Sequence, residues 1–159
     1  MTITPAIKDL SLPQQFLFLK ASKTVGGEGA LNARRLKWCF DAQPTPLSRS
    51  YRVSLVLEPG DTPEVKIVDP DLRVLSGGRD LPHIYHNPDR LCLYLPGTGQ
   101  WDASKRLDLT IVPWTHLWLI YFEEWLVSDE WKGGGRHPGD EPESNGNRAL
   151  RRRIRRRPY

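Results

Sequence analysis

The chain has 159 residues, 38% of them apolar and 26% charged, which suits one globular domain with its own hydrophobic core. It shows no apolar run of the roughly 20 residues that span a membrane and no N-terminal signal-peptide pattern, and its two cysteines are too few for a disulfide scaffold, so a cytoplasmic protein with free thiols is expected. The net charge of +4 lies entirely in residues 139–159, which argues against a nucleic-acid-binding domain, because such domains usually carry basic residues over their folded surface.

Composition divides the chain into a domain, residues 1–138, and an arginine-rich tail, residues 139–159. The tail holds seven arginines and three acidic residues, whereas the domain holds 16 basic and 16 acidic residues. A segment so polar and charged is expected to be flexible, and it could bind an acidic partner or nucleic acid, or remain solvated. The triple glycine at 133–135 and the pair His137-Pro138 just before the tail suggest a surface segment that folds back.

The first half of the domain predicts one helix followed by strands. Residues 12–21 favour a short helix that starts near Pro13, with an edge strand as the alternative, and the glycines of residues 26–29 predict a turn. Residues 36–40 alternate and carry aromatic side chains, as a strand does, and Cys39 within them is expected to belong to the core.

An antiparallel hairpin is the clearest signal in the chain. Tyr51, Val53, Leu55 and Leu57 alternate with more polar residues, which is typical of a half-buried strand. A proline–glycine turn follows at residues 58–61, and residues 64–68 return as the partner strand. With residues 36–40, these strands predict a three-stranded meander, to which residues 72–75 could add a fourth strand.

Residues 113–131 predict a long helix that ends before the triple glycine. Pro113 suits a first helical turn, where its missing N–H costs nothing. An apolar stripe at helical spacing predicts that this helix is largely buried against the sheet. The stripe consists of Trp114, Leu117, Trp118, Tyr121 and Trp125.

Cys92 is the candidate nucleophile. It lies between two leucines, after a polar turn formed by His86, Asn87 and Pro88 and before a glycine-bearing loop at residues 96–99. His83 also lies nine residues before Cys92, so two histidines and an asparagine are near the thiol in the sequence. A thiol with such neighbours can serve in nucleophilic catalysis. The simpler alternative is a buried cysteine that packs as a small hydrophobic residue.

Two other chemistries use the same residue types. His83, His86 and Cys92, with either His116 or His137, could bind zinc, but the spacing H-x2-H-x5-C matches no standard pair of ligands. Hydrolysis of the Cys–His type remains open. The sequence contains no dinucleotide or phosphate-binding loop, so the protein is not expected to activate a substrate with ATP, and no cofactor or metal is expected.

The order of these features resembles that of the ubiquitin-conjugating enzymes. These share a lead helix, an antiparallel meander, a histidine–proline–asparagine turn, a cysteine beside a leucine, a tryptophan and a core helix; here Trp101 lies nine residues after Cys92. More narrowly, the chain is similar to the stand-alone ubiquitin-conjugating-like proteins of prokaryotic CBASS anti-phage operons. The resemblance is tightest over residues 81–138, weaker over 31–80 and absent from the tail, and the segments that carry it are LCLYLP, IVPWTHLWLIYFEEWL and the W.GGG.HP pattern.

The resemblance implies an α/β fold, in which a meander sheet packs on helices and an active-site loop precedes the central helix. It also implies a cysteine-dependent acyltransferase. Cys92 would carry the C-terminal carboxyl group of a partner protein as a thioester and pass it to an amine such as a lysine. The implied partner is a cyclic-oligonucleotide synthase, a cGAS-like nucleotidyltransferase of the same operon, whose conjugation supports antiviral defence.

The resemblance also implies roles around Cys92. The family turn reads His-Pro-Asn, whereas here the order is His86, Asn87, Pro88. Asn87 and His86 would orient the loop or stabilise the oxyanion, and His83 is an alternative donor. Trp101 and Tyr94 are expected to shape the substrate cleft.

Two further classes of function compete with this one. A non-catalytic scaffold of the same fold would leave Cys92 incidental, and a fully buried thiol would favour it. A nucleic-acid-binding protein acting through residues 139–159 would lose affinity steeply with salt.

Overall fold

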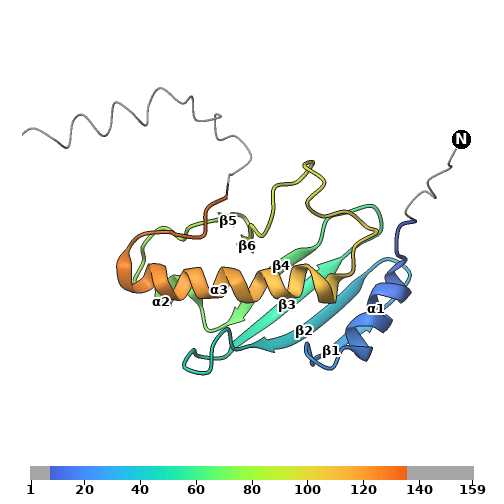
Figure 1. Cartoon of the computed structure of the whole chain (residues 1–159), viewed down its shortest axis with the longest axis horizontal. Coiled ribbons are helices and arrows are strands. Elements are labelled where there is room, and N and C mark those ends of the chain that lie inside the picture. The colour runs from blue at the N-terminus through green and yellow to red at the C-terminus, as the bar shows by residue number, and fades with distance from the viewer. Residues whose placement is uncertain (1–7, 136–159) are drawn as a thin grey trace, which may run out of the picture.

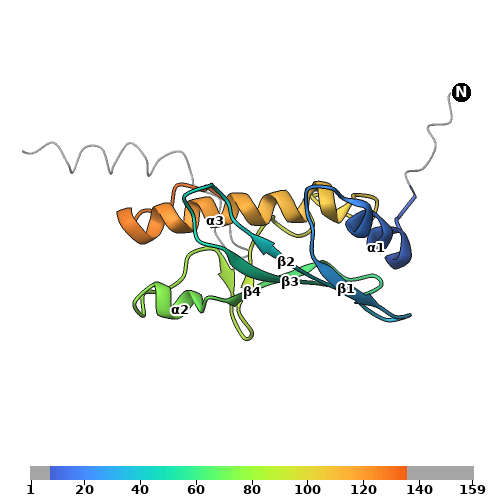
Figure 2. The same cartoon turned by 90° about the horizontal axis from the view of Figure 1, so that it is seen from below.

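A four-stranded antiparallel sheet packed against one long helix forms the body of the protein, as the computed structural model of residues 8–135 shows (Figure 1). The sheet has the order β1-β2-β3-β4, and α3 runs along one of its faces, with α1 near one end and α2 near the other (Figure 2). The mixed α/β class with an antiparallel meander, predicted from the sequence, is confirmed. The elements are α1 (Leu12–Ala21), β1 (Glu28–Leu31), β2 (Leu36–Ala42), β3 (Tyr51–Leu57), β4 (Glu64–Asp69), α2 (Leu72–Leu75), β5 (Ile84–Tyr85), β6 (Arg90–Leu91), the short 3₁₀ helix η1 (Leu107–Leu109) and α3 (Ile111–Ser128).

The core lies between α3 and one face of the sheet. Alternate residues of β2 and β3 are buried, and their register places Trp38 opposite Leu55 and Phe40 opposite Val53. The side chains of α3 cover this face, so the alternation read from the sequence reflects a sheet with one packed face. The buried residues of α3 are Ile111, Val112, Thr115, Trp118, Leu119, Phe122 and Trp125.

The sheet gains its fourth strand before β2, and the prediction of a strand at residues 72–75 is wrong. Residues 72–75 form α2, because the Asp71 carboxylate accepts hydrogen bonds from the backbone N–H groups of Arg73 (2.8 Å) and Val74 (3.4 Å) and so caps a helix. The fourth strand is β1, which begins inside the segment predicted as a turn. A glycine is needed at position 29 of this strand because the Trp38 ring occupies the space of a side chain there. A Cβ on Gly29 would lie 2.6 Å from Trp38 Cε3.

The long helix is shifted from its predicted ends. It spans 111–128 instead of 113–131, and it stops at Asp129, which adopts the left-handed conformation (φ 59°) and donates its N–H to the Trp125 carbonyl. The helix is also less buried than predicted, since Leu117 is 47% exposed and Val127 is 91% exposed. Trp131 therefore lies beyond the helix, in a segment that returns along it.

Cys39 is only partly buried, because its side chain alternates with the buried Trp38 and Phe40 along β2; the prediction that it belongs to the core is wrong. His137 and the tail at residues 139–159 lie outside the described part of the chain, and their predicted roles stay predictions. Within residues 8–135 no helix has the length and apolar character needed to cross a bilayer.

Gln15 fastens α1 to the segment that leads into α3. The helix α1, predicted correctly at residues 12–21, begins with a capping box in which Ser11 and Gln14 exchange hydrogen bonds. Gln15 is fully buried and uses both ends of its amide: Nε2 donates to the Lys105 carbonyl (2.9 Å) and Oε1 accepts from the Leu107 N–H (3.0 Å). The backbone polar groups of residues 105 and 107 thus find partners inside the protein.

Replacing Gln15 with leucine tests this attachment. Gln15→Leu keeps a side chain of similar size but strips partners from two backbone groups, and we expect it to lower the free energy of unfolding by about 1–3 kcal/mol in urea denaturation. The matched control is Leu17→Ala on the same helix, where Leu17 is 63% exposed, and it should change stability by about 0.5 kcal/mol or less. Equal stabilities for the two variants would contradict the assignment.

Candidate functional site

A short hairpin places Cys92 beside His83. Strands β5 and β6 pair antiparallel, with Ile84 opposite Leu91 and Tyr85 opposite Arg90. One residue further out, the Cys92 N–H donates a hydrogen bond to the His83 carbonyl (2.9 Å). Residues nine positions apart in the sequence are therefore neighbours across the hairpin, and the structure brings together two of the residues predicted to act in catalysis.

His83 and Cys92 both line a pocket of about 560 Å³. Its walls come from the Cys92 loop, one side of α3 and the segment after that helix. Among the described residues no Asp, Glu, Lys or Arg side chain lines it. Its aromatic lining consists of His83, Tyr94, Trp114, Trp118, Tyr121 and Trp131. Most of the apolar stripe predicted for α3 lines this pocket, through Trp114, Leu117, Trp118 and Tyr121. Trp125 is buried and lies outside the pocket lining.

Trp131 closes one side of this pocket by folding back over His83. The two rings stack with centroids 4.9 Å apart, and the indole also lies 5.6 Å from Trp118 and 5.9 Å from Tyr121. Gly135 passes close to the same histidine, since a Cβ there would lie 3.1 Å from His83 Cε1. The sequence pattern assigned Trp131 to a helix end and gave no sign of this role.

The sulfur of Cys92 contacts two tyrosines. Sγ lies 3.4 Å from the hydroxyl oxygen of Tyr85 and 3.9 Å from the backbone carbonyl oxygen of Tyr94. Burial, followed by the hydrogen bond with Cys92, raises the pKa of Tyr85 above its ordinary value, and burial raises the pKa of Tyr94. Tyr85 was not among the predicted site residues, because only the pairing of β5 with β6 shows that its hydroxyl reaches the sulfur.

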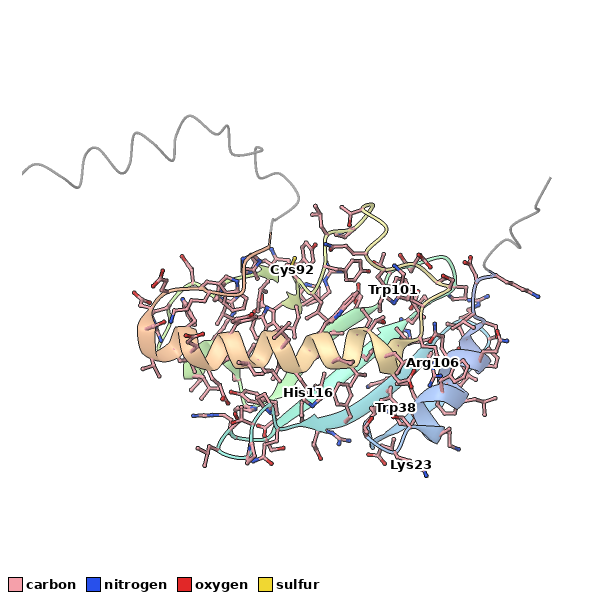
Figure 3. All side chains as sticks on the ribbon, viewed as in Figure 1. Lys23, Trp38, Cys92, Trp101, Arg106 and His116 are labelled. Carbon is pink, nitrogen blue, oxygen red and sulfur yellow. The ribbon has the colours of Figure 1, made fainter. Side chains whose placement is uncertain are left out.

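Cys92 is buried at the wall of the pocket. The residue is 8% exposed, so it belongs to the buried class, yet it forms part of the pocket wall. Figure 3 shows Cys92 and Trp101 on one side of α3, and His116 and Trp38 on the other. A reactant must therefore enter the pocket to reach the sulfur.

His86 and Asn87 lie at the turn of the hairpin, exposed and outside the pocket lining. His86 Nδ1 is 3.2 Å from Asp89 Oδ1, and Arg73 of α2 holds the same carboxylate with two bonds of 2.7 and 2.8 Å. These bonds, that of Arg73 first, keep the pKa of Asp89 below its ordinary value. Asn87 adopts a left-handed conformation (φ 59°), which asparagine tolerates better than most residues. Both residues are thus placed to shape the turn.

Trp101 lies in the core, 8% exposed, and does not line the pocket. Its ring is 6.2 Å from that of Tyr94, which does line the pocket, so Trp101 supports the wall from behind. His116 stacks against Phe40 on the sheet side of α3, away from Cys92. No three His, Cys, Asp or Glu side chains within residues 8–135 are placed to hold a metal ion.

Comparison with known proteins gives one family. Residues 15–138, most of the chain and the whole of the site, match the family model described as "E2-CBASS: Type II CBASS E2 protein". No curated protein matches the chain.

Alkylation measures whether the pocket opens to Cys92. The Cys39→Ala variant leaves Cys92 as the cysteine that reacts, and rates in the folded protein are compared with rates in urea. We expect Cys92 of the folded protein to react with iodoacetamide, a small reagent. It should react much more slowly with a bulky dye-linked maleimide. Trp131→Ala removes one wall of the pocket and should raise the rate with the bulky reagent. The double variant Cys39→Ala, Cys92→Ala gives the background from groups other than the cysteines. Native Cys92 that resists iodoacetamide for as long as the protein stays folded would show that the sulfur is sealed.

Proposed function

The chain belongs to the family of type II CBASS E2 proteins, which gives it an E2-like role in CBASS defence, and we propose that it fills this role as an acyltransferase through Cys92. The observation that carries the proposal is the position of the sulfur. It forms part of the wall of an aromatic pocket, with a histidine beside it and a tyrosine hydroxyl within 3.4 Å. A nucleophilic thiol needs this combination of access and polar neighbours.

In the loading step, the Cys92 thiolate adds to the carbonyl carbon of an activated C-terminal acyl group, such as an acyl adenylate or a thioester on another protein. The bond to the leaving group breaks, its electron pair departs with that group, and a thioester to Cys92 results. The activated acyl group comes from outside the chain, because the sequence holds no nucleotide-binding loop.

In the transfer step, the nitrogen of an amine adds to the carbonyl carbon of the thioester. The nitrogen loses a proton, the carbon–sulfur bond breaks with its electron pair on sulfur, and an amide and the Cys92 thiolate are formed. We assign His83 as the base that accepts the proton, because its ring lines the same pocket as Cys92. The stacked Trp131 ring fixes the orientation of the imidazole.

The pocket also suggests what the carried tail looks like. Its lining is aromatic and, within the described residues, carries no acidic or basic side chain. Such a surface binds apolar or small uncharged residues better than charged ones, because a charged side chain would lose hydration without gaining a partner. Tyr94 contributes to this surface directly and Trp101 from behind. We propose that the tail belongs to the cyclic-oligonucleotide synthase of the same operon.

A scaffold that uses the same surface without chemistry is the second candidate. The 8% exposure of Cys92 favours it, since a sulfur so enclosed admits only a slender chain. A scaffold would bind the tail in the aromatic pocket and form no covalent bond. The two candidates differ in what replacement of the sulfur does.

Replacing Cys92 separates transfer from scaffolding. With the synthase and its activating system present, we expect Cys92→Ala to abolish every conjugate, and Cys92→Ser to accumulate an oxyester that resists thiols, because an alkoxide is a poorer leaving group than a thiolate. The control Cys39→Ala should conjugate as the unaltered protein does. Conjugates are followed on non-reducing and reducing gels, and their undiminished formation by Cys92→Ala would exclude the acyltransferase.

Paired substitutions at Asn87 distinguish a structural role from oxyanion stabilisation. Asn87 lies outside the pocket lining at a positive φ, so we expect Asn87→Gly, which keeps this conformation accessible, to conjugate within a few-fold of the unaltered protein. Asn87→Ala should be less stable, because alanine tolerates a positive φ less well than asparagine or glycine does. If the amide stabilises the oxyanion, both variants instead lose about 100- to 1,000-fold in rate.

A further inference from the structure

The hydroxyl of Tyr85 contacts the sulfur of Cys92, and the proposed function gives it no step in the reaction. Tyr85 ends β5, and the pairing of Tyr85 with Arg90 brings its hydroxyl to 3.4 Å from Cys92 Sγ. The two residues belong to opposite strands of one hairpin, so the contact is set by backbone pairing and does not depend on a mobile loop. Such a contact is within the range of hydrogen bonds that involve sulfur.

We propose that Tyr85 is a catalytic residue, whose hydroxyl donates a hydrogen bond to the sulfur of Cys92 whenever that sulfur is negatively charged. The proposal rests on the proposed function, because it concerns the same sulfur as nucleophile and leaving group. It differs from the roles inferred for His83, His86 and Asn87, which concern the proton of the amine and the shape of the turn.

The direction of this hydrogen bond follows the charge on sulfur. In the neutral thiol, the S–H group donates to the Tyr85 oxygen; in the thiolate, only the hydroxyl has a proton to donate. Burial and the contact with Cys92 raise the pKa of Tyr85 above its ordinary value, so the hydroxyl keeps its proton throughout the physiological range. The hydroxyl can therefore donate to an anionic sulfur throughout that range.

The hydroxyl reaches the sulfur from outside the substrate pocket. Tyr85 is not among the residues that line the large pocket; it lines a separate cavity of about 50 Å³, together with Arg90, Glu64 and Tyr94. Cys92 lines the large pocket. The tyrosine can thus bond one side of the sulfur while the other side faces the acyl group, and this geometry favours stabilisation of the thiolate over stabilisation of the oxyanion.

The charged groups around this pair are few and mostly compensated. The Arg90 guanidinium lies 5.8 Å from the centre of the Tyr85 ring and forms an ion pair of 2.6 Å with Glu64. His83 lines the same pocket as Cys92, and the Tyr94 carbonyl oxygen lies 3.9 Å from the sulfur. Tyr85→Phe removes the hydroxyl that contacts Cys92 Sγ and leaves the ion pair of Arg90 with Glu64 in place.

The hydrogen bond acts at two points of the cycle. Before loading, it stabilises the thiolate that forms when the Cys92 thiol gives its proton to water or to a base. During transfer, the carbon–sulfur bond breaks and its electron pair returns to sulfur, where the hydroxyl donates again. While the thioester exists the sulfur is neutral and the bond is weak, so the interaction favours the charged states over the acylated one.

The pH dependence of alkylation tests the contact without any partner protein. The rate at which iodoacetamide reacts with Cys92 is measured against pH in three proteins. These are the Cys39→Ala protein and its Tyr85→Phe and Tyr121→Phe variants. A hydrogen bond to a charged group is lost in Tyr85→Phe, so we expect the midpoint of the profile to move upward by about one pH unit. Tyr121→Phe, which removes a hydroxyl from the pocket wall, should leave the midpoint in place.

Thermal unfolding of the three proteins shows whether each is folded under the assay conditions. A profile of folded Tyr85→Phe that superimposes on that of the unaltered protein would overturn the proposal, and so would an equal shift in Tyr121→Phe. If Tyr85→Phe does not fold, Tyr85→Trp, which keeps an aromatic side chain and an N–H donor displaced from the hydroxyl position, should show the same upward shift.

The outcome is separate from the fate of the acyltransferase. Alkylation needs no acyl donor, so a shifted profile stands even if Cys92 forms no conjugate, whereas an unshifted profile with normal conjugation rejects only the role of Tyr85. Where both hold, Tyr85→Phe should also slow conjugation at neutral pH, and raising the pH by about one unit should recover most of the loss, a rescue that a purely structural defect would not show.

Discussion

The hydrogen bond from the Cys92 N–H to the His83 carbonyl, 2.9 Å long, holds the site together. It extends the pairing of β5 with β6 by one residue and so fixes Cys92 beside His83. The same carbonyl accepts a second bond of 3.2 Å from Nε1 of Trp118, which anchors the hairpin to α3. The His83 ring in turn stacks on Trp131 and faces Gly135. His83 thus connects Cys92, the long helix and the segment that follows it.

The fold supplies a rigid support for this junction. Helix α3 packs its buried face on β2 and β3 and leaves its other side to line the pocket, so the apolar residues of one helix serve both the core and the site. Gln15 ties α1 to residues 105 and 107, just ahead of α3, and Arg73 of α2 holds Asp89 in the hairpin turn. The elements at both ends of the sheet therefore restrain the loop that carries Cys92.

The sequence predicted what depends on local pattern. Alternation in residues 51–57 follows from one packed face of a sheet. The helix at residues 12–21 was predicted from Pro13 near its start, and Cys92 was singled out by the polar turn before it. Features that depend on tertiary contact were missed. Gly29 read as part of a turn because only the Trp38 ring lying across it explains a glycine in a strand. Residues 72–75 were read as a possible strand because their apolar side chains do not show that Asp71 caps them as the helix α2.

The site shows the same division. His83, Cys92 and Tyr94 were predicted and meet in one pocket, whereas His86 and Asn87 lie at the turn and Trp101 lies in the core. Tyr85 and Trp131 were missed, because pairing across the hairpin and the return of the chain past Asp129 have no signature in residue spacing. The family match over residues 15–138 agrees with the resemblance, which was drawn most tightly over residues 81–138 and more weakly over 31–80, and extends it to residue 15.

The central claim is that Cys92 itself carries an acyl group, and peptide mapping of the loaded protein tests it most directly. Trypsin cuts after Arg90 and Lys105, so Cys92 lies in the peptide of residues 91–105 and Cys39 in that of residues 38–49. Mass spectrometry of a conjugate isolated at neutral pH without thiols should find the C-terminal peptide of the partner on residues 91–105, released by hydroxylamine. A partner peptide attached to residues 38–49 would contradict the claim. So would a partner peptide attached to a lysine in a conjugate that Cys92→Ala also forms.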